Sequence, residues 1–337
     1  MFPKVSVIIP CRNEELHIAE CILSIIRGTY PSEQTEILVV DGSSEDNTEK
    51  IVTQLKDTYT NITILQNPKR IFPAAVNVGV KYSTGEYLLI LGAHALYSTD
   101  YIEKCINAAM KYDADNVGGI LITTGLNKGV IGKSINKVLS SSFGVGNATF
   151  RTGSKDVTEV DTVFGGCYKK EVFEKIGYFN EHLISSSDME FNKRLKRSGG
   201  KIFLIPDIIV NYYTRNTLNS FFKNNLRNGY WAIYPIGLTT FIPVSIRHFV
   251  PLLFLLSIVG CLLLSLIFPF FLWVLLAEMS LYLIASIGAS FSSIPINILF
   301  ATTMPLLFLS LHLLYGLGSF WALLKLPFVK KQIENES

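Results

Sequence analysis

Val5-Ser6-Val7-Ile8-Ile9-Pro10-Cys11-Arg12-Asn13-Glu14 opens the chain with an apolar run that stops sharply and gives way to polar side chains. A run rich in Val and Ile and bounded in this way is typical of a buried strand. Comparable runs occur at residues 37–40, 62–65 and 87–91, and amphipathic stretches begin between them. This alternation predicts an α/β domain whose mainly parallel sheet is covered by helices on both faces.

Residues 116–161 break this alternation, because they are rich in Gly, Ser, Thr and Asn and show no clear period. We expect these residues to hold a loop on the side of the site that receives an acceptor substrate.

The last third of the 337-residue chain differs in composition from the rest. Between Phe241 and Leu324 only Arg247 and Glu278 are charged, although the chain contains 30 basic and 27 acidic residues. Apolar runs of about 20 residues are long enough to cross a bilayer. Such runs fit near Phe249–Phe268, Phe270–Ile287 and Ile296–Leu317. Glu278 would need a polar partner inside the membrane, and His312 is one candidate.

The number of spans depends on where the C-terminus lies. Three spans would place Lys325, Lys330 and Lys331 on the side opposite a cytosolic catalytic domain, which the positive-inside rule disfavours. A fourth short segment or a re-entrant one would remove the conflict. We therefore expect a catalytic domain at residues 1–213, an amphipathic interfacial segment at 214–240, three or four membrane segments within 241–326 and a polar tail at 327–337. The alternative for residues 214–240 is a packed surface helix of the soluble domain.

Charge and cysteine usage narrow the class of protein. A net charge of +3, with no basic run carrying interleaved aromatic residues, argues against nucleic acid as a partner. Five scattered cysteines without a Cys-x-x-Cys pair indicate neither a disulfide framework nor a zinc site. The apolar run at residues 5–9 is too short for the core of a signal peptide. We therefore expect a cytosolic catalytic domain on a multi-pass anchor in the cytoplasmic (inner) membrane.

Polar side chains follow the first two predicted strands, at the carboxyl ends where open parallel sheets bind ligands. Asp41, beside the flexible Gly42, is suited to accept hydrogen bonds from a uracil ring or a ribose, and Arg12 is suited to meet phosphate. An Asp-Gly-Ser turn also caps helices in many proteins, so this signal alone is weak.

Gly92-Ala93-His94 follows the strand pattern at residues 87–91. An imidazole at a strand end could hold a divalent ion against a diphosphate. A structural histidine is an equal alternative, because no acidic side chain stands at position 92.

Asp188 lies at the start of a predicted helix over residues 188–198. A carboxylate there, near Gly165-Gly166, can deprotonate an acceptor hydroxyl while the anomeric carbon is attacked from the opposite face, which inverts its configuration. The alternative is a helix cap with Glu190 as a first-turn acid, and spacing alone favours it.

Together these segments resemble family 2 glycosyltransferases with the GT-A fold, a nucleotide-sugar-binding fold, and most closely the ExoA-like group of succinoglycan biosynthesis. The resemblance runs from Val5 to about Trp231 and is followed by a similar hydrophobic tail. Five separated segments occur in the family's order, which makes the match specific. It implies a GT-A domain followed by an interfacial helix and a transmembrane bundle, and an inverting hexosyltransferase of class EC 2.4.

The resemblance also implies roles for individual residues. It assigns donor or nucleotide contacts to Pro10, Arg12, Asn13, Glu14, Asp41, Ser43, Asn77, Gly79, Gly92, Ala93, Gly165, Gly166 and Arg227. Asp188 is the implied catalytic base. The resemblance assigns Glu190 and Trp231 to the acceptor side of the site, and it assigns His94 as the metal ligand.

Two departures fall at the chemistry. Gly92 replaces the first acid of the family's metal motif, so a divalent cation, Mn²⁺ or Mg²⁺, would rest on His94, diphosphate oxygens and water. Ser187 replaces the acid before the base. These losses keep a second reading open: a degenerate transferase fold that binds a nucleotide or a partner without turnover.

By resemblance, the donor is a nucleotide sugar, with UDP favoured over GDP or dTDP. The implied acceptor is a glycan or a sugar linked to polyprenyl diphosphate, and membrane lipid surrounds the anchor. Exopolysaccharide or other surface-glycan synthesis is the implied pathway.

Overall fold

The computed structural model describes residues 2–125, 127–214, 217–291 and 298–336. The chain forms two compact units. Unit 1 comprises Met1–Ile122 and Gly153–Tyr213, and unit 2 comprises Thr123–Thr152 and Thr214–Ser337. The chain therefore leaves unit 1, returns to it, and leaves it again.

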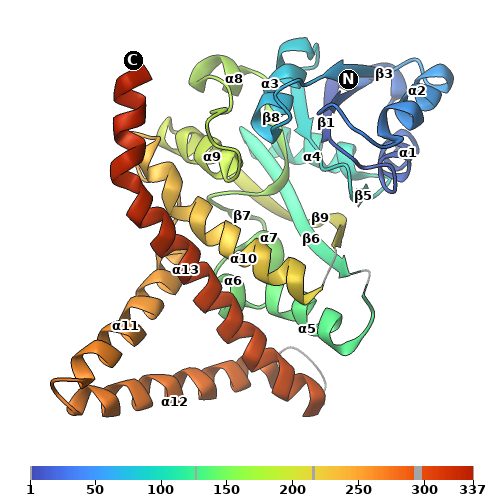
Figure 1. Ribbon diagram of the computed structural model, residues 1–337. Coiled ribbons are helices and arrows are strands. Elements are labelled where there is room, and N and C mark those ends of the chain that lie inside the picture. The colour runs from blue at the N-terminus through green and yellow to red at the C-terminus, as the bar shows by residue number, and fades with distance from the viewer. Residues whose placement is uncertain (1, 126, 215–216, 292–297, 337) are drawn as a thin grey trace. The chain divides into compact units, whose positions relative to one another are not determined.

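A nine-stranded sheet forms the core of unit 1, in the order β3-β2-β1-β4-β8-β6-β9-β5, with β7 paired to β9 (Figure 1). The parallel part is β1 (Val5–Cys11), β2 (Thr35–Asp41), β3 (Ile62–Gln66) and β4 (Tyr87–Ile90). Parallel pairing needs a crossover, usually helical. Crossover helices are α1 (Ile18–Ile26), α2 (Thr48–Thr58) and α3 (Phe72–Tyr82).

The rest of the sheet is mixed. Its strands are β5 (Ala95–Tyr97), β6 (Asn116–Gly125), β7 (Thr158–Glu159), β8 (Phe164–Lys169) and β9 (Ile202–Thr214). The pairs β4–β8, β6–β8, β5–β9 and β7–β9 are antiparallel. Parallel order is thus confirmed for the first four strands only. The remaining elements of unit 1 are η1 (Ser32–Gln34), α4 (Tyr101–Lys111), α8 (Glu171–Ile176) and α9 (Ser187–Arg197).

Unit 2 is helical. It contains α5 (Val130–Leu139), α6 (Ser142–Val145), α7 (Thr149–Thr152), α10 (Leu218–Ile233), η2 (Tyr234–Gly237), η3 (Ile246–Phe249), α11 (Val250–Ser265), α12 (Phe270–Phe291) and α13 (Ile298–Glu336). Helix α10 runs beside α13 (Figure 1). The stretch expected to be an acceptor-side loop instead completes β6 and forms α5 to α7, and α5 packs its buried Ile135 and Val138 against Phe308 of α13.

Within the described ranges, three helical stretches are long and apolar enough to cross a membrane: Ile246–Ser265, Phe270–Phe291 and Thr302–Val329. The expected start of the third span, Ile296, lies outside the described residues. Glu278 accepts a hydrogen bond from the Ser257 hydroxyl at 2.5 Å. His312, the partner expected for it, pairs with the Tyr282 hydroxyl at 2.7 Å instead.

Candidate active site

The carboxyl ends of the parallel strands form one edge of the sheet, because Cys11 is in register with Asp41 and Asp41 with Gln66. Asp41 is 1% exposed. Its carboxylate accepts hydrogen bonds from the backbone N–H of Ser44 at 2.9 Å and from the Ser44 hydroxyl at 2.5 Å. Ser43 has φ of +56°, the left-handed region that a tight turn requires. In this structure Asp41 stabilises its own turn, and its contact with a nucleotide base stays a prediction.

The loop after β1 is bonded to the loop after β2. The Asn13 side-chain oxygen accepts from the N–H of Glu45 at 2.8 Å, and the Asn13 N–H donates to Ser44 Oγ at 2.9 Å. The Glu14 N–H donates to Thr48 Oγ1 at 2.8 Å. The polar motif that follows the first strand is therefore held rigidly beside the second, as a preorganised binding edge requires.

Two guanidinium groups meet at this edge. Arg12 and Arg70 lie 3.4 Å and 3.7 Å from the same carboxylate oxygen of Glu45. All three side chains are at least 41% exposed, so these ion pairs are weak and exchangeable. A phosphate could replace Glu45 between the two cations. Arg70 carried no role in the sequence analysis. Arg70 has a left-handed φ of +57°, and sequence gives no clear sign of that geometry.

His94 lies between two strand ends. Its Nδ1 is 3.0 Å from Glu14 Oε1, and its Nε2 is 2.8 Å from the Tyr212 hydroxyl on β9. Both ring nitrogens therefore already have protein partners. Gly92 offers no side-chain ligand, and its carbonyl accepts from the Tyr97 hydroxyl at 3.2 Å.

A divalent cation does not fit these residues as they stand. A metal ligand needs a free lone pair, and the two nitrogens of His94 are occupied by Glu14 and Tyr212. Among the described residues no cluster of three or more His, Cys, Asp or Glu side chains is placed to hold an ion. Gly92 has no side chain that could act as a further ligand beside His94.

Gly165 and Gly166 are the second and third residues of β8, beside the end of β4. Gly165 has φ of +61°, and its carbonyl accepts from the Tyr101 hydroxyl at 2.9 Å. A Cβ on Gly166 would lie 2.6 Å from both Asn116 Oδ1 and the Tyr168 ring. Neither position accepts a side chain without strain or displacement, so backbone conformation at Gly165 and packing at Gly166 both require glycine.

Asp188 is the second residue of α9, and its side chain is exposed. Surrounding protein removes part of its hydration and raises the pKa of the Asp188 carboxyl above its ordinary value of 3.8, against the opposing effect of the backbone N–H of Met189. Burial raises the pKa of Tyr168 on β8, and the charge of Asp188 raises it further. Asp188 therefore acts electrostatically on β8, the strand that carries Gly165 and Gly166.

A buried polar network fixes α9 to the sheet. Asn192, one turn after Asp188, is fully buried and accepts from the Tyr168 hydroxyl at 3.0 Å and from the Asn116 amide at 3.1 Å. Its own amide donates to Thr162 Oγ1 at 2.9 Å. The sequence analysis missed this network. The i,i+4 spacing of Asn192 from Asp188 was the only available signal.

Glu190 is buried in an ion pair. It is 3% exposed and pairs with Arg194, with oxygen to nitrogen distances of 2.6 Å and 3.0 Å. Arg194 also donates to the carbonyls of Ile176 and Tyr178 at 2.5 Å and 2.7 Å. This placement gives Glu190 a structural role in holding α9, rather than the acceptor contact that was expected.

Asn77 and Gly79 on α3 are likewise explained by packing. The Asn77 amide donates to the Phe179 carbonyl and to Glu181 at 2.9 Å each, and its oxygen accepts from the Phe179 N–H. A Cβ on Gly79 would lie 2.4 Å from Ile8 on β1. Both residues therefore secure elements around the site, and neither presents a free group to a donor.

The other expected site residues divide between the units. Pro10 is the penultimate residue of β1, and Ala93 is 2% exposed beside His94. Arg227 and Trp231 lie on α10 in unit 2. The Arg227 side chain is exposed, and the Trp231 ring packs edge-on against neighbouring tyrosines. Their donor and acceptor contacts stay predictions.

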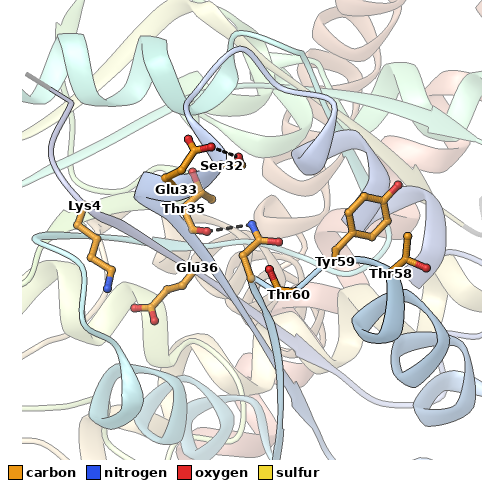
Figure 2. Close-up of a pocket in the computed structure, with 9 residues that line it drawn as sticks. Lys4, Ser32, Glu33, Thr35, Glu36, Thr58, Tyr59 and Thr60 are labelled. Carbon is orange, nitrogen blue, oxygen red and sulfur yellow. Dashed lines mark hydrogen bonds between the residues drawn. The ribbon is translucent and has the colours of Figure 1, made fainter.

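A cavity of about 500 Å³ lies at the opposite end of the parallel strands (Figure 2). It is lined by Lys4, Ser32, Glu33, Thr35, Glu36, Thr58, Tyr59, Thr60 and Asn61. These residues precede or begin β1, β2 and β3, whereas parallel sheets bind ligands at the carboxyl ends. This cavity is therefore separate from the candidate active site.

Comparison with known proteins identifies the family. Residues 6–177 match the family model described as Glycosyl transferase family 2. The chain is 32% identical over 232 residues to the "Dolichyl N-acetyl-alpha-D-glucosaminyl phosphate 3-beta-D-2,3-diacetamido-2,3-dideoxy-beta-D-glucuronosyltransferase" of Methanococcus voltae, covering 67% of this chain and 71% of that protein. It is 29% identical over 214 residues to "Succinoglycan biosynthesis protein ExoA" of Rhizobium meliloti (strain 1021), covering 63% of this chain and 64% of that protein. The chain thus spans about two thirds of the length of these relatives.

Among solved structures, the fold resembles that of the mannosyltransferase PcManGT from Pyrobaculum calidifontis, which was determined in complex with GDP-Man and Mn²⁺. The TM-score is 0.58 at 17% identity, over 95% of this chain and 88% of that one. At this identity the likeness concerns the fold alone, and it confirms the expected GT-A domain followed by apolar helices. The family match covers more than half of the chain, so the chain belongs to glycosyl transferase family 2, the glycosyltransferases of class EC 2.4.

Proposed function

We propose that this chain is an inverting glycosyltransferase that moves a sugar from a nucleoside-diphosphate donor to a lipid-linked or polysaccharide acceptor. Asp188 is the observation that carries the proposal. It is an exposed carboxylate on the first turn of α9, a helix that Asn192 fixes to the strand β8, which carries Gly165 and Gly166. A general base needs this combination of access and fixed position.

The chemistry follows from that placement. Asp188 takes the proton of the acceptor hydroxyl as its oxygen attacks the anomeric carbon of the donor. The bond from that carbon to the diphosphate oxygen breaks, and the nucleoside diphosphate leaves with its electron pair. Attack on the face opposite the leaving group converts an α-linked donor into a β-glycoside.

On the donor side, Arg12 and Arg70 would neutralise the diphosphate by exchanging Glu45 for phosphate oxygens. Asp41 and Ser43 would hold the base and ribose, and Gly165 and Gly166 would lie beneath the sugar. No step is assigned to a divalent cation, because the residues near His94 do not form a site for one.

The proposal also names the class of the donor and of the acceptor. We favour a UDP-sugar, and an acceptor carried on polyprenyl diphosphate at the cytosolic face of the cytoplasmic membrane. The printed names of the relatives support this class of acceptor, since one acts on a dolichyl-linked phosphate sugar and the other serves succinoglycan biosynthesis. Three helices apolar enough to cross a membrane support the location.

The test is turnover in membranes that contain the full chain. UDP-, GDP- and dTDP-sugars are offered with and without Mn²⁺, and release of the nucleoside diphosphate is measured for the native chain, Asp188→Asn and the control Asp57→Asn. Asp57 is an exposed carboxylate on α2. We expect Asp188→Asn to lose at least 100-fold in turnover while binding nucleotide normally, and Asp57→Asn to be unchanged.

A degenerate nucleotide-binding or partner-binding homologue is the second candidate, favoured by Gly92 and Ser187 in place of acids. It predicts nucleotide binding without turnover on any donor, and indifference to Asp188→Asn. Either result would contradict the enzymatic proposal and favour this second candidate.

A further inference from the structure

Short connections join unit 2 to unit 1. β6 ends at Gly125 and α5 begins at Val130, while β9 ends at Thr214 and α10 begins at Leu218. An extended chain advances at most about 3.6 Å per residue, so neither connection can traverse a hydrocarbon core of about 30 Å. Helices α5 and α10 therefore start on the side of the membrane that holds unit 1.

Neither helix is suited to enter hydrocarbon. Lys133 and Lys137 are exposed on α5, and Lys223 and Arg227 are exposed on α10. A single Lys or Arg at the bilayer centre costs about 2.5–3.5 kcal/mol on insertion scales. Both helices therefore stay at the interface or in water, with their apolar faces turned to α13.

The N-terminal part of α13 is bonded to α5. The hydroxyls of Ser134 and Thr303 are 3.0 Å apart, and Met304 and Phe308 belong to the same buried cluster as Val138. This end of α13 consequently lies on the side that holds unit 1.

The middle and the C-terminal part of α13 are packed against α10 and η2. A Cβ on Gly318 would lie 2.0 Å from the Leu226 carbonyl oxygen, and the Ser319 hydroxyl donates to the Gly229 carbonyl at 3.0 Å. A Cβ on Gly237 of η2 would lie 3.2 Å from Val329. The other end of α13 is therefore held on the same side.

These contacts span the whole third apolar stretch. Thr303 to Val329 is about 39 Å of helix, longer than a hydrocarbon core. A helix that crossed the bilayer would present its two ends on opposite sides, yet both ends of this stretch contact elements tethered to one side. Helix α13 cannot satisfy these contacts and also cross.

Helices α11 and α12 form the remaining apolar surface. A Cβ on Gly316 would lie 2.4 Å from the Pro251 carbonyl oxygen at the start of α11, and Tyr282 of α12 bonds to His312. Helices α11 and α12 therefore form a hairpin whose two arms both contact α13. The turn between the arms lies at the end of the hairpin away from these contacts.

The turn of this hairpin is entirely apolar: Leu266, Ile267, Phe268 and Pro269. The first three are 82%, 71% and 56% exposed. Their N–H groups donate to the carbonyls of Leu263 and Leu264, and proline has no N–H to satisfy. Backbone in lipid must be satisfied internally, so this turn is suited to stay inside the bilayer rather than to emerge into water.

We propose that the chain is anchored by a re-entrant hairpin, α11–α12, which enters and leaves the bilayer on one face while α13 lies along that face. Lys325 then stays on the side of unit 1, as the positive-inside rule favours. The inference rests on the membrane location given under the proposed function. It means that none of the three apolar helical stretches crosses the bilayer completely.

Cysteine labelling tests this arrangement in the full chain. Four of the five native cysteines are buried, so Cys261→Ser supplies the background. Lys128→Cys, Lys325→Cys and Ile267→Cys are added one at a time, with Phe270→Cys as a second variant near the turn. All four positions are exposed. A membrane-impermeant maleimide is applied to bacterial spheroplasts, to inverted vesicles and to detergent extracts.

We expect Lys128→Cys and Lys325→Cys to react in inverted vesicles and in detergent but not in spheroplasts, and Ile267→Cys and Phe270→Cys to react only after detergent. Reaction of Lys325→Cys, but not of Lys128→Cys, in spheroplasts would overturn the proposal in favour of three crossings. Reaction of the turn variants in spheroplasts would show a hairpin that crosses completely. Reaction of both Lys128→Cys and Lys325→Cys from outside would instead refute the cytosolic location and leave the hairpin supported.

Discussion

Asp188 lies on the first turn of α9, and the protein packed near it raises the pKa of its carboxyl. A base must be deprotonated to act, so activity falls as pH drops through its pKa. Because that pKa is raised, we expect the acidic limb of kcat to have its midpoint above pH 3.8, the ordinary value. The measurement is kcat against pH, with nucleotide affinity as control. A midpoint at or below 3.8 would contradict the assignment.

Gly92 has room for a side chain, since an added Cβ would meet only the Phe164 ring, at 3.8 Å. We expect Gly92→Asp to supply the acidic ligand that the site lacks, and to raise the affinity for Mn²⁺ at least tenfold in the presence of nucleotide. Isothermal titration with Mn²⁺ measures this. Gly92→Asn is the matched control of similar size. Equal affinity in both variants would mean that position 92 does not face an ion.

At the scale of single residues, the sequence pointed to the right strand ends but not to the partners of each side chain. Asp41, Asn77 and Glu190 are polar residues in family motifs, and each is fully engaged by neighbours in the fold. Those neighbours lie up to about a hundred residues away in the chain, as Phe179 does from Asn77. Spacing cannot reveal such pairs, because they form only when α3 and the segment before α9 meet.

Among the structural elements, α9 depends on one buried ion pair. Arg194→Met would leave the carboxylate of Glu190 buried without a partner, which costs about 3–5 kcal/mol. We expect a clear fall in Tm, measured by thermal unfolding in detergent. The double variant Glu190→Gln/Arg194→Met should recover much of the loss, because it removes both charges. If Glu190 served the acceptor instead, Glu190→Gln alone would raise the acceptor KM and leave Tm unchanged.

The crossing of α10 and α13 depends on glycine. A Cβ at Gly229 would lie 1.9 Å from the Tyr315 carbonyl oxygen, and one at Gly318 would lie 2.0 Å from that of Leu226. We expect Gly229→Ala and Gly318→Ala each to cost about 1–3 kcal/mol by overpacking. Gly288→Ala on α12 is the matched control, because its Cβ would meet nothing within 4 Å. Comparable Tm values for all three variants would refute the close crossing.

The elements that the sequence predicted best are those with local causes. Strands β1 to β4 and their crossover helices follow from apolar runs and amphipathic periods. The antiparallel half of the sheet and helices α5 to α7 could not be predicted from such local patterns, because their pairing is decided by distant segments. The short apolar face of α5, with Ile135 and Val138, has meaning only beside Phe308.

At the scale of the whole molecule, the packing of α5 against α13 can be tested by substitutions in α5 alone. Ile135 is 2% exposed and Ile131, on the same helix, is 42% exposed. Ile135→Asp would bury an unpaired charge between α5 and α13, which folding tolerates poorly. We expect this variant to be lost or aggregated on gel filtration in detergent, and Ile131→Asp to elute as the native chain does. Equal behaviour of the two would mean that α5 does not cover α13.

The same packing has a consequence for synthesis. Val138 of α5 is made 173 residues before Leu311, a member of the same buried cluster on α13. At roughly 5–20 residues per second, translation leaves the apolar face of α5 uncovered for about 9–35 s. Unit 1 is still incomplete when α5 to α7 are made, because its second segment, Gly153–Tyr213, follows α7. The growing chain therefore needs temporary cover for α5, from a chaperone or from the membrane surface itself, before its own last helix arrives.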